Sequence, residues 1–171
     1  MIKTILFSNL FSIFTAISAL RTNGLLNRHP LTIMKKIFST SVSIASLSLA
    51  LLLLRIGVAA LMFTHGIPKL EKVLAGDFAF GDPLGIGVST SLVLTVLSEV
   101  GCSLLLLLGV GTRLAVLPLI FTMLVAILVV HADDPFGNKE LALFYLLIYL
   151  VLLILGSGRY SIDYQISRRN P

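Results

Sequence analysis

Charged residues are scarce in this chain of 171 residues, at 12% of the sequence against about 25% in a typical soluble domain. Hydrophobic residues make up 57%. Because so little charge cannot keep the surface of a globule this small in water, the composition excludes a soluble enzyme, a disordered chain and a nucleic-acid-binding module. The remaining class is an integral membrane protein with one small helical domain.

Residues that build redox and metal centres are also few. A single cysteine, Cys102, excludes an intramolecular disulfide, a CxxC pair and a cysteine-ligated cluster. The three histidines form neither HxxxH nor HExxH, and no GxGxxG or Walker loop occurs. We therefore predict no metal and no bound cofactor. Cys102 lies among leucines, where burial disfavours the thiolate, and is most simply a packing residue.

Long uncharged stretches predict four membrane-spanning helices. A span needs about 20 mostly apolar residues, because the hydrocarbon core is about 30 Å thick and a helix rises about 1.5 Å per residue. The stretches place helices near residues 41–64, 88–110, 113–131 and 139–156, without the alternation of a membrane β-strand. The predicted fold is an all-α integral membrane four-helix bundle over residues 41–160, followed by a basic cytoplasmic tail, residues 161–171.

The connections between these helices differ in length, and their charge predicts orientation. Residues 65–85 form a long loop with a short helical turn at Leu70–Leu74, residues 109–112 a tight hairpin, and residues 131–139 a turn-rich loop. By the positive-inside rule, both ends of the four-helix core lie in the cytoplasm. The basic residues on the cytoplasmic side are Arg21, Arg28, Lys35, Lys36, Arg113, Arg159, Arg168 and Arg169, against Lys69, Lys72 and Lys139 outside.

Residues 1–40 form an N-terminal extension that fits this scheme less well. Residues 3–19 resemble a signal peptide, with a basic start, an apolar middle and a small residue at Ala19. Cleavage there would put the new N-terminus outside, against the charge bias. An additional hydrophobic membrane helix is a second alternative. A translation start at Met34, directly before two lysines, is a third, and all three stay open.

Arg55 and Glu99 interrupt the predicted spans, where a charge costs about 2.5–3.5 kcal/mol or more. Counted from Thr64 and Val88, the expected outer helix ends, they lie roughly 14 and 16 Å deep. Similar depth on neighbouring helices predicts an Arg55–Glu99 ion pair. The pair either fixes helix register or forms a central polar site for a ligand, a proton or a quinone head group. Small polar residues on the face of Glu99 suit a ligand site or close packing: Ser91, Thr95, Cys102 and Ser103.

A second polar cluster is expected at the outer ends of the helices. His65 and Lys69 follow the first span, His131 ends the third, and Glu140 opens the fourth, with Tyr145 further along. A histidine beside an acid can shuttle protons near neutral pH, so His65, His131 and Glu140 are candidate gate residues. Interfacial anchoring is the simpler interpretation of Lys69 and Tyr145.

From about Leu51 to Tyr160, the chain resembles the DoxX family of small four-helix bacterial membrane proteins. The resemblance lies in RIGVAALMFTHGIPKLEK (residues 55–72), EVGCSLLLLLGVGTRLA (99–115) and KELALFYLL (139–147). Family members often have a second glycine where this chain has Cys102. The resemblance implies redox chemistry, because relatives include subunits linked to thiosulfate:quinone oxidoreduction and proteins of oxidative-stress complexes, although many members have no assigned reaction.

These features and the resemblance predict a DoxX-like subunit, in a bacterial inner membrane, of a quinone-linked or thiol-linked redox system. Arg55 and Glu99 are its predicted central site. Whether the chain is itself an enzyme stays open. It has no haem, flavin or dithiol motif, so any electron carrier is a diffusible quinone or belongs to a redox-enzyme partner. The alternative is a scaffold or small-solute carrier whose Arg–Glu pair is structural. The expected partners are the lipid bilayer, redox subunits and further copies of the chain, with no nucleic acid.

Overall fold

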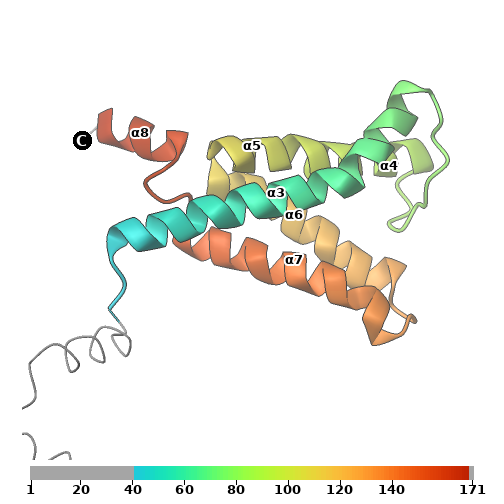
Figure 1. Cartoon of the computed structure of the whole chain (residues 1–171). Coiled ribbons are helices and arrows are strands. Elements are labelled where there is room, and N and C mark those ends of the chain that lie inside the picture. Colours follow the sequence, from blue (N-terminus) through green and yellow to red (C-terminus); the bar gives the residue numbers. More distant parts are fainter. Residues whose placement is uncertain (1–40, 170–171) are drawn as a thin grey trace, which may run out of the picture. The chain divides into compact units, whose positions relative to one another are not determined.

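The computed structural model describes residues 41–169 of the chain. The alternatives for residues 1–40 therefore lie outside the described residues. Within residues 41–169 all regular structure is helical and no strand occurs. In chain order the helices are α3 (Ile44–Leu74), α4 (Val88–Val96), η1 (Leu97–Cys102), α5 (Ser103–Leu108), α6 (Thr112–Val125), η2 (Ala126–Val130), α7 (Phe136–Leu155) and α8 (Ile162–Arg169), where η marks a π-helical segment (Figure 1).

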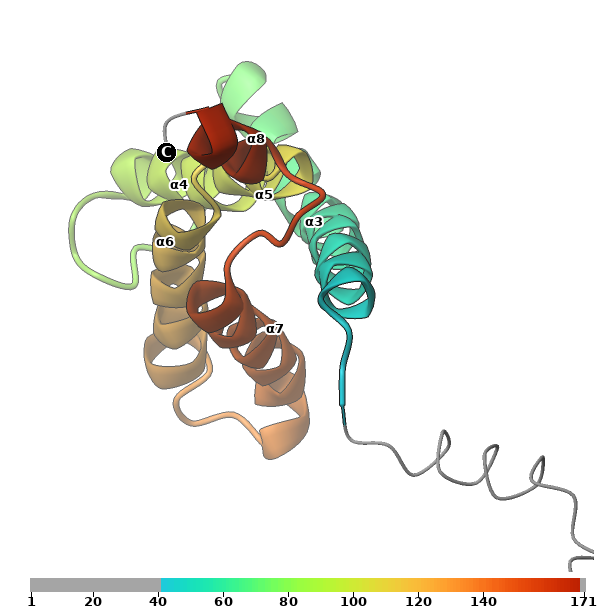
Figure 2. The ribbon, with the colours of Figure 1, turned by 90° about the vertical axis from the view of Figure 1, so that its left-hand side faces the viewer.

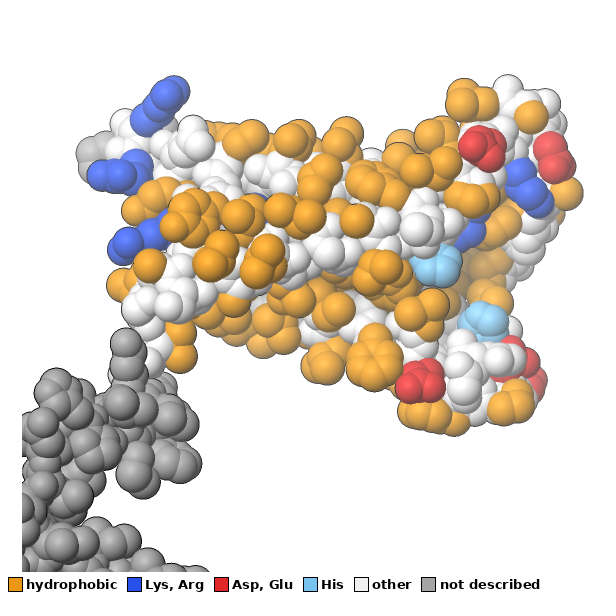
Figure 3. All heavy atoms as spheres, viewed as in Figure 1, with side chains coloured by type: hydrophobic (Ala, Val, Ile, Leu, Met, Phe, Trp, Pro, Cys, Tyr) orange, Lys and Arg blue, Asp and Glu red, His pale blue; other side chains and the backbone are white. Residues whose placement is uncertain are grey.

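Four continuous helical stretches are long and apolar enough to cross a membrane. They are Ile44–Leu74, Val88–Leu108, Thr112–Val130 and Phe136–Leu155. Many leucine, isoleucine, valine and phenylalanine side chains on them point outward. Figure 3 shows hydrophobic atoms over the middle of this part and charged groups gathered at its two ends. The predicted all-α, four-helix membrane fold is thus confirmed, and the chain is a multi-pass membrane protein.

The first span is longer than predicted. It was expected to end at residue 64, but α3 continues through Pro68 to Leu74. The expected long loop thus shrinks to residues 75–87, and the expected turn at Leu70–Leu74 is the last turn of α3. Proline removes one N–H donor and so one backbone hydrogen bond. A helix tolerates this loss where it packs against neighbouring helices. Here Gly66 is buried against the second span, so packing outweighs the proline.

The core lies between the helices at the centre of the bundle. α6 and α7 pack along each other, and α3 packs against α4, η1 and α5. Small-to-medium apolar side chains and two tyrosines fill the space between them. The fully or nearly fully buried members include Val58, Met62, Leu106, Val116, Leu119, Tyr145, Tyr149 and Leu152.

The bundle has two ends of different character, which we name by their connections. The hairpin end comprises residues 109–112, the start of α3, the end of α7 and α8. The loop end comprises residues 75–87 and 131–135. Figure 2 views the hairpin end, where the chain crosses from α7 to α8. The hairpin between α5 and α6 turns tightly because Gly109 and Gly111 take positive φ angles of 70° and 55°, which other residues rarely adopt.

Candidate functional site

A buried ion pair links α3 to the second span near the loop end. Lys69 Nζ lies 2.6 Å from both carboxylate oxygens of Glu99. The Glu99 side chain is 5% exposed and the Lys69 side chain 26%, so the carboxylate is inside the protein and the ammonium reaches toward its edge. Such a short charge-assisted contact in a low-dielectric setting satisfies a carboxylate that the membrane would otherwise exclude.

The predicted Arg55–Glu99 pair is wrong. Arg55 lies 14 residues before Lys69 on α3, which is about 21 Å along a helix. The depth of Arg55 was counted from Thr64 as the helix end, and this end is ten residues too early because α3 ends at Leu74. With the longer helix, Lys69 reaches Glu99 and Arg55 lies toward the hairpin end. The assignment of Arg55 and Glu99 to catalysis stays a prediction.

Local backbone features bring Lys69 and Glu99 together. A Cβ on Gly66 would lie 2.7 Å from Val100 Cγ2 and 3.1 Å from Glu99 Cβ, so only glycine allows this close approach. Glu99 itself lies in the π-helical turn η1, and single π turns inside α-helices are frequent at functional sites. Lys69 follows Gly66 by three residues, on the same face of α3. This spacing was the available signal for Lys69, which the sequence interpretation treated as an anchor.

A cavity of about 430 Å³ opens beside this ion pair. Its walls are mostly apolar, and its polar groups come from α3, α4, η1, α6 and the turn after η2. The polar lining residues are Lys69, Ser91, Thr95, Ser98, Glu99, Thr122 and His131. Of the predicted polar stripe, Ser91 and Thr95 line this cavity, whereas Cys102 packs against the core and Ser103 is fully buried.

Residues 80–86 form one wall of the cavity and are held by Asp82. The Asp82 carboxylate accepts hydrogen bonds from Ile86 N (3.0 Å), Gly87 N (2.8 Å) and Ser91 Oγ (2.8 Å). The Ser91 hydroxyl and the backbone amides stabilise the charged form and lower the pKa of Asp82. Asp82 thereby fastens the loop to the start of α4, with Leu84 and Ile86 against the cavity.

The residues of the predicted outer cluster have different surroundings. His131 lines the cavity, and its Nδ1 lies 2.7 Å from Asp134 Oδ2, a contact that lowers the pKa of Asp134. His65 is exposed, with its ring edge on Tyr145 at 5.9 Å between centroids. Glu140 is exposed and lies outside the cavity lining. His65 contacts Tyr145 on α7, whereas His131 lies at the cavity beside Asp134, and the gate role of His65, His131 and Glu140 stays a prediction.

Arg55 forms a separate buried site at the hairpin end. Its side chain is fully buried, and Nη2 donates to Tyr160 O at 2.5 Å. Its Nε and Nη1 have no hydrogen-bond partner among residues 41–169. The guanidinium packs so tightly on Gly109 that a Cβ there would overlap Nη1. The charge of Asp163 also acts on Arg55. Arg55 thus ties α3 to the hairpin and to the segment after α7.

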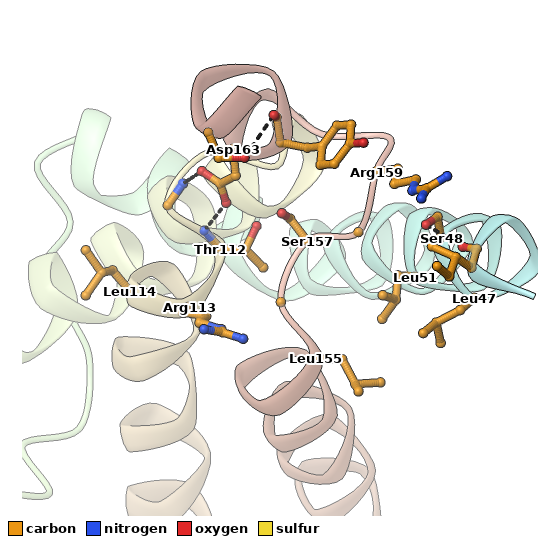
Figure 4. A pocket seen from close by; sticks show the side chains of 16 residues that line it. Leu47, Ser48, Leu51, Thr112, Arg113, Leu114, Leu155, Ser157, Arg159 and Asp163 are labelled. Atoms are coloured by element: carbon orange, nitrogen blue, oxygen red, sulfur yellow. Dashed lines mark hydrogen bonds between the residues drawn. The ribbon is translucent and has the colours of Figure 1, made fainter. Parts of the chain in front are cut away.

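Asp163 completes this tie by capping α6. Its carboxylate accepts from Gly111 N (2.7 Å) and Thr112 N (3.0 Å), two of the unpaired amides at a helix start (Figure 4). Its own N–H donates to Gly109 O at 3.0 Å. Burial raises the pKa of Asp163. The hydrogen bonds from the two amides lower this pKa by more than burial raises it, so the pKa is below its ordinary value. The sequence interpretation had placed Asp163 in a basic tail without a role.

Comparison with known proteins assigns a family to this arrangement. The DoxX family model matches residues 50–132. The chain belongs to the DoxX family. An uncharacterized protein of Haemophilus influenzae (strain ATCC 51907 / DSM 11121 / KW20 / Rd) is 35% identical over 121 residues, covering 64% of this chain and 85% of that protein. "Putative oxidoreductase CatD" of Bacillus subtilis (strain 168) is 28% identical over 119 residues, covering 69% and 87%. No solved structure matches significantly.

The DoxX match covers the cavity beside Glu99 completely and the Arg55 site only in part. Every residue that lines the cavity, from Lys69 to His131, falls inside the matched segment 50–132. Arg55 and Gly109 also fall inside it, whereas Asp163, Tyr160 and all of α7 fall outside it. Among residues 41–169 of this DoxX protein, no group of three or more His, Cys, Asp or Glu side chains lies close enough to hold a metal ion. The cavity offers instead one ammonium, one carboxylate, one imidazole and four hydroxyls.

Proposed function

We propose that this DoxX-family protein is the membrane subunit of a redox system and binds a quinone head group in the cavity beside Lys69 and Glu99. The observation that supports this proposal most directly is the Lys69–Glu99 ion pair at the edge of an apolar cavity of about 430 Å³. That volume falls within the about 300–1,000 Å³ usual for ligand sites, and a few polar groups in apolar walls are the usual lining. A quinone ring with two carbonyl oxygens is complementary to such a lining.

The polar groups suit the proton chemistry of a quinone. Reduction to a quinol takes up two electrons and two protons, and both carbonyl oxygens become hydroxyls. The Lys69 ammonium and the His131 imidazole donate hydrogen bonds to these oxygens, and Glu99 accepts or returns a proton. Lys69 is partly exposed, which connects the buried carboxylate to water at the loop end. The electrons come from a partner oxidoreductase, because a chain with one cysteine has no dithiol of its own.

The name of one relative supports a redox role in general terms. The Bacillus subtilis protein is named "Putative oxidoreductase CatD", and this chain covers 87% of it. The proposal also places the protein in a bacterial inner membrane with the hairpin end in the cytoplasm. Among the described residues outside the bundle core, that end holds Arg113, Arg159, Arg168 and Arg169, as the positive-inside rule requires.

Quinone binding can be tested with purified protein in nanodiscs and a short-chain benzoquinone, followed by calorimetry. Wild type binds, and Glu99→Gln and Lys69→Met lose at least about tenfold in affinity, which corresponds to about 1.4 kcal/mol. Matched controls are Glu71→Gln and Lys72→Met. Both side chains are exposed on α3, the helix of Lys69, and neither lines the cavity. Equal affinity of the wild type and the Glu99 and Lys69 variants, with unchanged circular dichroism and melting, contradicts the proposal.

One observation favours a second candidate, a scaffold whose ion pair is structural. Lys69 already contacts both oxygens of Glu99, so the pair is satisfied without a ligand. Well-packed apolar residues often replace such buried pairs without loss of stability. Under this alternative, the double variant Lys69→Met with Glu99→Leu folds and complements a deletion strain. Under the quinone proposal, it folds but does not complement.

A further inference from the structure

We propose that the hairpin end carries a selective binding site for an anionic phospholipid, distinct from the cavity beside Lys69 and Glu99. The site is a second cavity of about 540 Å³ between the start of α3, the start of α6 and the end of α7. None of its lining residues lines the first cavity. This second cavity lies where two spans begin, at Ile44 and Thr112, and one ends, at Leu155. The ends of the spans mark the depth of the lipid head groups.

The walls of this second cavity are divided into an apolar and a basic part. Leu47 and Leu51 on α3 and Leu155 on α7 point into the space between the two helices, as Figure 4 shows. Arg113 and Arg159 line the same cavity and are both exposed. An amphiphile with an acyl chain and a negative head group matches both parts. A soluble anion matches only the arginines.

The one acidic residue in the lining does not cancel these arginines. The Asp163 carboxylate accepts hydrogen bonds from the amides of Gly111 and Thr112, and it interacts electrostatically with the buried Arg55. The free charge at the cavity is therefore positive, which is complementary to a phosphodiester.

The Arg113 side chain is pre-organised to bind a phosphate at the depth of the lipid head groups. Its Nη2 donates to Ile154 O at 3.2 Å, which fixes the guanidinium over the end of α7. A Cβ on Gly156 would lie 3.5 Å from Arg113 Nε, so the guanidinium lies flat against this glycine. The remaining N–H donors of the guanidinium are then already oriented for a ligand. The planar guanidinium matches the geometry of phosphate oxygens.

Lipid retention can be measured by native mass spectrometry of the full chain released from nanodiscs. The probes are phosphatidylglycerol, phosphatidylethanolamine of the same acyl chains, and inorganic phosphate. We expect phosphatidylglycerol to be retained in preference to phosphatidylethanolamine. Arg159→Gln should lower that retention about fivefold and Arg113→Gln with Arg159→Gln about 25-fold, since a basic residue near an anionic lipid contributes about 1 kcal/mol.

The matched control is Arg168→Gln, which lies at the same end but outside the lining and faces the Tyr164 ring at 5.8 Å. It should retain phosphatidylglycerol as wild type does. The Arg159 variant keeps the test valid if Arg113→Gln disturbs the Ile154 contact. Equal retention of both lipids, an equal loss in the Arg168 variant, or binding of inorganic phosphate alone overturns the lipid assignment.

Discussion

The contact between Arg55 and Gly109 makes a sharp prediction for two glycines of one hairpin. Both Gly109 and Gly111 have positive φ, so alanine at either position costs about 1–2 kcal/mol in backbone strain. The space around them differs. At Gly111 a Cβ meets nothing within 4 Å, whereas at Gly109 it overlaps Arg55 Nη1 and lies 2.7 Å from Ser161 Cβ.

The Gly109 substitution therefore carries a second cost. Arg55 must withdraw its guanidinium, which breaks the hydrogen bond to Tyr160 O, and a hydrogen bond of a charged group contributes about 1.5–3 kcal/mol. Gly109→Ala should lower the free energy of unfolding by about 2.5–5 kcal/mol, and Gly111→Ala by about 1–2 kcal/mol. Gly57→Ala, where a Cβ meets nothing and φ is not positive, should be nearly neutral.

The assay is denaturant-induced unfolding of the purified variants in one detergent, followed by circular dichroism, with thermal melting as a second probe. By both probes, Gly109→Ala should be the least stable variant, Gly111→Ala the next and Gly57→Ala the most stable. Equal losses at Gly109 and Gly111 would refute the reasoning, because they would mean that the buried guanidinium adapts freely to a methyl group.

Three further predictions follow from other contacts. Gly66→Ala should cost about 1–3 kcal/mol by overpacking against the second span, whereas Gly101→Ala, with nothing within 4 Å, should not change the melting temperature. The lowered pKa of Asp163 contributes stability that is present above its ordinary value of 3.8 and is lost as pH falls through the lowered pKa. Asp163→Asn should remove that acid dependence of melting. Ser91→Ala should raise the pKa of Asp82, measured by carboxyl NMR titration, and an unchanged pKa contradicts the role of the hydroxyl.

The sequence predicted the fold well because the signal is compositional. Uncharged stretches of about 20 residues locate spans through a single physical constraint, the thickness of the hydrocarbon core. The starts of the second and third spans came out within one residue, at Val88 and Thr112. The end of the first span did not, since charge and proline after Thr64 suggested a loop. Gly66 and Lys69, which pack against the second span, keep that segment helical.

The candidate site was less predictable than the fold, since partners depend on where helices end and on local irregularities. A ten-residue error in the length of α3 was enough to assign Glu99 the wrong partner. The π turn at Leu97–Cys102 and the cap that Asp163 provides across about 50 residues of chain have no periodic signature that sequence inspection detects. The residues themselves, Arg55 and Glu99, were found because a membrane makes any buried charge conspicuous.

Arg55 and Glu99, both found by that rule, differ in what surrounds them. Arg55 contacts backbone and glycine at the hairpin end, where Tyr160 O is its one hydrogen-bond acceptor among residues 41–169. It lines neither cavity. Glu99 lies against a cavity together with an imidazole and hydroxyl groups. A buried charge that is enclosed by its own backbone stabilises the fold, whereas one that borders free space can meet a ligand. This difference, rather than the charge itself, directs the functional tests to Glu99 and the stability tests to Arg55.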